Sequence, residues 1–126
     1  MSYATRYVQS AAQTASRERT MLMLFDKAVA CMRSGTAAMT ERRYAQANKD
    51  LAKALDIVAH LRGTLNRPVA PELCDNLSAL YMFVVVRLGE AKLHRNPQLA
   101  REAEQVFAPV AQAFTQAVAS LSSEAR

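Results

Sequence analysis

The sequence is poor in residues that build turns and strands. Its 126 residues include three glycines, four prolines, one isoleucine and no tryptophan, whereas alanine occurs 24 times and leucine 13 times. So few turn-forming residues exclude a β-sandwich or barrel, and the abundance of alanine and leucine favours helices. Because 51% of the residues are hydrophobic, one packed core is possible. We therefore predict a single all-α domain.

The side chains that usually carry chemistry are also scarce. Cys31 and Cys74 form no CxxC pair and are interpreted as small buried apolar residues. His60 and His94 do not follow a glutamate by three residues, which excludes a di-iron carboxylate site, and both are expected at the surface. Neither a glycine-rich phosphate loop nor a GxSxG motif is present. We predict no enzyme activity, no catalytic residue, no metal and no cofactor.

Long apolar segments are missing as well. The uncharged stretch around the longest apolar run, 76–86, has 11 residues, fewer than the roughly 20 that span a bilayer. The first residues, MSYATRYVQS, lack the apolar segment of a secretory signal. The sequence therefore predicts a cytoplasmic protein with no membrane insertion.

The net charge of +5 raises nucleic acid as a partner, but the arrangement of the charges argues against it. Lysines and arginines alternate with acids, as in Arg17-Glu18-Arg19, and no basic run exceeds two residues. A solvated surface is the better interpretation, and no nucleic-acid partner is predicted.

Apolar residues recur with helical spacing in four segments, at about 16–39, 41–65, 71–93 and 96–121. Ser16 and Thr40 are predicted as N-caps of the first two helices, and Asn96-Pro97 opens the fourth. The short connections make successive helices antiparallel neighbours, so we predict an up-down four-helix bundle. Residues 1–15 are expected to form an N-terminal arm, 16–121 the bundle and 122–126 a C-terminal tail. Pro109, inside the fourth helix, predicts a kink.

The repeat also predicts which residues form the core. Each helix has an apolar seam with spacings of three and four residues. The predicted seams are Met21, Phe25, Ala28, Met32, Gly35 and Met39; Tyr44, Ala47, Leu51, Ala54, Val58, Leu61 and Leu65; Leu73, Leu77, Leu80, Val84, Leu88 and Ala91; and Leu99, Ala103, Val106, Val110, Ala113, Ala117 and Leu121.

The third helix has more apolar residues than its seam requires. Residues 79–86, ALYMFVVV, form an uninterrupted apolar run. At 100° per residue, Ala79, Met82, Phe83 and Val86 point away from the seam, where a partner helix, a second subunit or the arm could cover them. The alternative is a tilted helix that simply buries more than one seam, and a binding module is the leading interpretation.

Several segments resemble the FliS family of flagellar export chaperones. These are Tyr7-Val8-Gln9 with Thr14-Ala15-Ser16, Leu22-Met23-Leu24-Phe25-Asp26, Lys53-Ala54-Leu55-Asp56-Ile57-Val58, and Asn76-Leu77-Ser78-Ala79-Leu80-Tyr81 followed by Arg87-Leu88. Departures from the family pattern include Arg17, Lys27, Met82 with Phe83, Pro109, and Phe114 in place of a tryptophan.

The resemblance implies a chaperone that binds the C-terminal segment of flagellin, prevents its premature polymerisation and delivers it to a component of the flagellar type III export gate. The predicted client-binding residues are Tyr7, Ile57, Asn76, Ala79, Tyr81, Met82, Phe83 and Val86. Two other hypotheses compete: a helical interaction or regulatory module with a different client, and a basic nucleic-acid-binding bundle.

Overall fold

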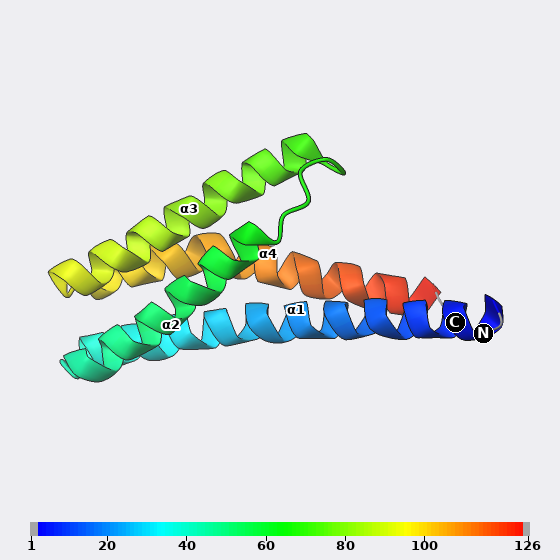
Figure 1. Ribbon diagram of the computed structural model, residues 1–126. Coiled ribbons are helices and arrows are strands. Elements are labelled where there is room, and N and C mark those ends of the chain that lie inside the picture. The colour runs from blue at the N-terminus through cyan, green and yellow to red at the C-terminus, as the bar shows by residue number, and fades with distance from the viewer. Residues whose placement is uncertain (1–2, 125–126) are drawn as a thin grey trace.

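The computed structural model describes residues 3–124, and the side chains of residues 4–5 and 16–121. It contains four helices, α1 (Tyr3–Thr40), α2 (Tyr44–Gly63), α3 (Pro71–His94) and α4 (Pro97–Glu124). Each helix packs against the one before and after it, and α4 packs against α1, which closes the ring (Figure 1). The predicted all-α four-helix bundle is confirmed.

The first helix begins earlier than predicted. Ser16 is not its N-cap, because α1 starts at Tyr3 and runs through this position. Residues 3–15 contain no glycine or proline and are rich in alanine and glutamine, so nothing in them stops a helix. Whether this segment acts as an arm stays a prediction.

The turn between α1 and α2 is also built differently from the prediction. Thr40 is the last residue of α1, and its hydroxyl donates to the carbonyl of Thr36 at 3.0 Å. It is therefore not the N-cap of α2, which begins at Tyr44 after Arg43. Arg42 takes a positive φ of 63° in this turn, and the N–H of Arg43 closes it by donating to the carbonyl of Ala38 at 2.8 Å.

The starts of α3 and α4 agree with the sequence. Pro71 occupies the first turn of α3, and the Asn96 side chain accepts a hydrogen bond from the backbone N–H of Gln98 at 2.9 Å. Arg95 ends α3 in the left-handed region with a φ of 50°. Pro109 lies inside α4, whose helical assignment continues through it; the kink stays a prediction.

The core lies where the seams of α1 and α2 predict it. In α1, Phe25, Ala28, Met32 and Met39 are buried, and the five buried residues of α2 are all seam positions. Aromatic rings join three of the helices at the centre. The Phe25 ring lies 5.6 Å from Phe107 and 4.8 Å from Phe114, and Tyr81 lies 6.1 Å from Phe107, centroid to centroid.

The seam predicted for α3 is wrong at Leu73 and misses Cys74 and Tyr81, while Leu80 packs against the core but is only partly buried. Cys74 and Tyr81 are buried, whereas Leu73 is exposed and Leu80 is half-buried. The observed seam, 74-77-81-84-88-91, alternates spacings of three and four throughout, while the predicted one contained two successive steps of four. Two successive steps of four turn the position by about 80° around the helix, which moves the seam away from the bundle axis.

In α4 the seam prediction is wrong in the C-terminal half. Ala113, Ala117 and Leu121 are exposed, whereas Phe107 and Ala111 are buried and Phe114 packs against the core. The large ring of Phe107 determines which side of the helix turns inward, because it buries more apolar area than a neighbouring valine or alanine.

Helices α1 and α4 run antiparallel, and their residues pair with a constant offset. Thr40 lies beside Arg101, Arg33 beside Glu104 and Phe25 beside Phe114. Continued toward the termini, this pairing brings the end of α4 beside the N-terminal part of α1 (Figure 1). The first turns of α1 therefore extend beyond α4, as the blue end of the ribbon shows (Figure 1).

Candidate partner-binding surface

The outward face of α3 carries the apolar residues predicted to bind a partner. Met82, Phe83 and Val86 are 39%, 38% and 49% exposed, and Ala79 is exposed beside them. Their spacing of three and four residues aligns them along one side of the helix. We call Ala79, Met82, Phe83 and Val86 the outer strip. Its exposure confirms that these side chains point away from the core.

A shallow hollow adjoins the outer strip on the α2 side. Met82 and Val85 line it from α3, and Ala59 and Gly63 line it from α2. Arg62 crosses its rim and donates from Nε to the Ser78 hydroxyl at 2.9 Å. Small residues on α2 thus leave room for an apolar side chain next to Met82, while Arg62 and Ser78 supply polar groups at the edge.

A charged group borders the strip on the α4 side. The Arg87 guanidinium lies 4.8 Å from the centroid of the Phe83 ring, a cation–π distance. Arg87 also pairs with Glu90 at 3.4 Å and, through Nε, with Glu102 of α4 at 3.5 Å. Its buried Nε has no hydrogen-bond partner, so the Glu102 contact is purely ionic. Arg87 therefore fixes one face of Phe83 and connects α3 to α4.

Two of the predicted site residues lie elsewhere. Tyr81 is only 3% exposed and faces the core beside Phe107, where burial raises the pKa of its phenol. Ile57 is half-buried on α2 and packs against the core cluster. Neither belongs to the outer strip, and a direct client contact by Tyr81 would require the bundle to open.

The remaining two differ from each other. Asn76 is exposed one turn before Ala79 and extends the line of the strip. The Tyr7 side chain lies outside the described residues, so its predicted role stays a prediction. Sequence reasoning missed Arg62, and it noted Ser78 and Arg87 only as parts of a motif. The spacing of Phe83 and Arg87 by four residues was a usable signal for their contact.

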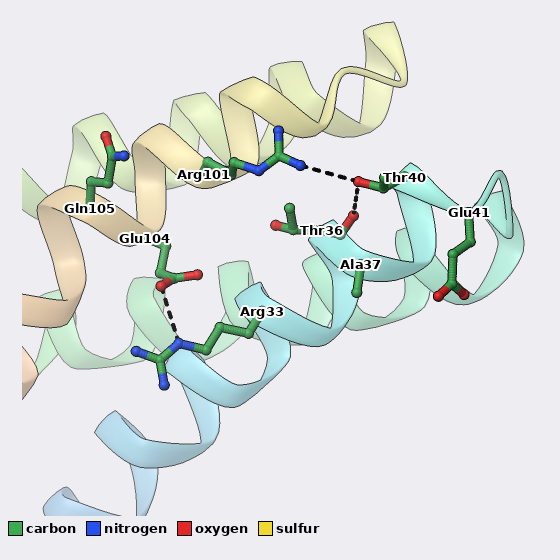
Figure 2. Close-up of a pocket in the computed structure, with 8 residues that line it drawn as sticks. All are labelled: Arg33, Thr36, Ala37, Thr40, Glu41, Arg101, Glu104 and Gln105. Atoms are coloured by element: carbon green, nitrogen blue, oxygen red, sulfur yellow. Dashed lines mark hydrogen bonds and ion pairs between the residues drawn. The ribbon is translucent and has the colours of Figure 1, made fainter.

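A second, polar hollow of about 530 Å³ lies between the end of α1 and the start of α4 (Figure 2). Arg33 pairs with Glu104 across it at 3.1 Å, and Arg101 reaches from α4 to the Thr40 hydroxyl at 3.4 Å. This hollow was not foreseen from the sequence, since its residues come from segments more than fifty positions apart.

Metal-binding and membrane-spanning features were also considered. Among residues 3–124, no group of three or more histidine, cysteine, aspartate or glutamate side chains is placed to hold a metal ion. Over the same residues, none of the helices combines the length and the apolar character needed to cross a bilayer.

Comparison with known proteins gives a consistent result. The family model for flagellar protein FliS matches residues 1–121. The flagellar secretion chaperone FliS of Escherichia coli (strain K12) is 30% identical over 119 residues, which cover 94% of this chain and 88% of that protein.

Two further relatives bear the same name. The flagellar secretion chaperone FliS of Salmonella typhimurium is 30% identical over 115 residues, covering 90% of this chain and 85% of that protein. The one from Bacillus subtilis (strain 168) is 28% identical over 116 residues, covering 92% and 86%.

Proposed function

This chain belongs to the FliS family of flagellar secretion chaperones, and from that membership we propose that it binds the C-terminal segment of flagellin in the cytoplasm. There it prevents premature polymerisation and supports delivery to the export gate of the flagellar type III apparatus. A secretion chaperone implies a client that is exported, and a chaperone family is not an enzyme family.

The outer strip is the observation that supports this proposal. An exposed line of apolar side chains on a helix suits a client helix that lays its own apolar face against it. The hollow beside Met82 would receive one client side chain, and Phe83, held by Arg87, would offer a rigid ring. Methionine is suited to such contacts because its flexible thioether adapts to partners of different shape.

Binding of this kind needs no catalysis. A client segment that is disordered when free loses conformational entropy as it folds onto the bundle, and many modest apolar contacts offset that loss. The covered client surface would then be unavailable for polymerisation.

The test is the substitution Val86→Asp, measured by calorimetric titration with a peptide of the flagellin C-terminal segment. Because Val86 is half exposed, we expect the free energy of unfolding to fall by about 1 kcal/mol or less. Binding would bury an unpaired carboxylate, so the affinity should drop at least tenfold, or about 1.4 kcal/mol.

Met23→Asp is the matched control, since Met23 is an apolar residue 66% exposed on α1 and outside the strip. It should leave the affinity nearly unchanged. A stable Val86→Asp protein with full affinity would place the flagellin site elsewhere. If the wild-type chain does not bind the peptide at all, a helical module with a different client becomes the better explanation.

A further inference from the structure

The end of the bundle opposite the chain termini concentrates the positive charge of the molecule. The α1–α2 and α3–α4 turns both lie there (Figure 1). Residues 40–43 and 92–101 contain five lysines and arginines and one acid, Glu41. The flanking acids Glu90, Glu102 and Glu104 already form ion pairs with Arg87 and Arg33. We call residues 40–43 and 92–101 the basic end.

Two contacts hold the segments of the basic end together. The Arg95 guanidinium lies 4.5 Å from the centroid of the Tyr44 ring, which connects the α3–α4 turn to the start of α2. Arg101 reaches Thr40 at the end of α1. The positive charges of the two turns, of the end of α3 and of the start of α4 therefore lie on one surface.

Most of these charges have no carboxylate partner. Glu41 pairs with Arg43 at 2.6 Å, but among the side chains that the structure describes Arg42, Lys92, Arg95 and Arg101 make no ion pair. Two helices start and two helices end at this surface, so the partial charges of their dipoles offset each other. The charged side chains therefore determine the electrostatic potential of the surface. Unpaired positive charges gathered in this way attract a negatively charged partner.

The polar hollow gives this surface a binding position. Of the cations that line it, Arg33 is neutralised by Glu104, whereas Arg101 makes only a long 3.4 Å contact with a neutral hydroxyl (Figure 2). A carboxylate would form a shorter and stronger hydrogen bond to Arg101 than Thr40 does.

An exposed apolar residue indicates which kind of partner fits. Leu93 is 77% exposed, between Lys92 and the turn at Arg95. A nucleic acid presents no aliphatic side chain to such a leucine, whereas an acidic peptide can present both carboxylates and an apolar anchor. We propose that the basic end is a second docking surface, separate from the outer strip, for an acidic protein segment that contains leucine-like side chains.

The experiment compares two double variants with equal changes in net charge. Lys92→Glu/Arg101→Glu alters the basic end, and Lys49→Glu/Lys53→Glu alters exposed positions of α2 as the control. The probe is a fluorescein-labelled peptide of glutamates with two leucines one helical turn apart, followed by fluorescence anisotropy at low and moderate salt. Thermal melting confirms that each variant is folded.

We expect the wild-type chain to bind this peptide, more weakly at higher salt, and the basic-end variant to bind it at least tenfold less tightly. The α2 variant should stay within about twofold of the wild type, and a peptide with serines in place of leucines should bind less tightly. Equal losses in both variants would show an effect of net charge alone and overturn the proposal. Tighter binding of a single-stranded DNA oligonucleotide with the same charge would overturn it in favour of nucleic acid.

The same variants separate this inference from the proposed function. The basic-end variant should bind the flagellin peptide as the wild type does, because its substitutions lie outside the outer strip. A parallel loss of both affinities would show a single shared surface and overturn the separation. Failure of flagellin binding in the wild type, with acidic-peptide binding intact, would contradict only the proposed function.

Discussion

Gly35 shows how closely α1 and α2 approach each other. A Cβ atom at this position would lie 2.6 Å from Leu51 Cδ2 and 2.8 Å from its Cγ, and Leu51 is fully buried. Alanine favours a helix over glycine by about 1 kcal/mol, but overpacking a filled core costs about 1–3 kcal/mol. We expect Gly35→Ala to lower the free energy of unfolding by up to about 2 kcal/mol in urea titration.

Gly89→Ala is the control for this prediction. Nothing lies within 4 Å of a Cβ at Gly89, so the same substitution should raise the free energy of unfolding by up to about 1 kcal/mol. If both variants are stabilised, α1 and α2 can separate without loss, and the contact at Gly35 is not a constraint.

At the scale of the helix, periodicity predicted the elements better than their orientation. The seams of α1 and α2 were predictable because each has a single apolar stripe bounded by polar residues. In α3, the run 79–86 is apolar on every side, so the pattern alone could not select Tyr81 over Leu80. The choice depends on Phe107 of α4, a contact that a single helix does not reveal.

The same limit applies to the candidate site. Met82, Phe83 and Val86 were predictable, because helical geometry places them opposite the seam residues Val84 and Leu88. Contacts between different helices were not predictable from the sequence. The Arg62–Ser78 hydrogen bond and the Arg87–Glu102 ion pair depend on how α3 lies between α2 and α4.

Pro109 gives a prediction for α4. Pro109 is exposed, and it lacks the backbone N–H that would donate to the carbonyl of Gln105. The aromatic contacts that hold α4 in the core are made by Phe107 and Phe114. Pro109→Ala should therefore raise the free energy of unfolding by about 1–3 kcal/mol in urea titration. Gln112→Ala, at an exposed position on the same helix, should change it by less than about 0.5 kcal/mol. A loss of stability in the proline variant would instead show that the packing of α4 requires a bend at this residue.

The packing of neighbouring helices against α1 changes along its length. Residues 25–39 of α1 pack in the core between α2 and α4, and residues near Ser16 still lie beside His60 and Thr64 at the end of α2. The helical backbone of residues 3–15 continues past the end of α2, and its first turns extend beyond the red end of α4 (Figure 1). A helix of that length is marginal in water without tertiary contacts.

Hydrogen exchange measured by mass spectrometry tests whether the amides of residues 3–15 are less protected than those of the core when no client is bound. If residues 3–15 remain an unaccompanied helix, their amides should exchange many times faster than those of residues 25–39, whose opening requires disruption of the core. Slow exchange in both segments would contradict this expectation and indicate that the N-terminal arm docks on the bundle. Deleting residues 1–15 separates the two cases further. A docked arm would compete with the client, so its removal should tighten flagellin-peptide binding, whereas removal of a projecting helix should leave the affinity unchanged.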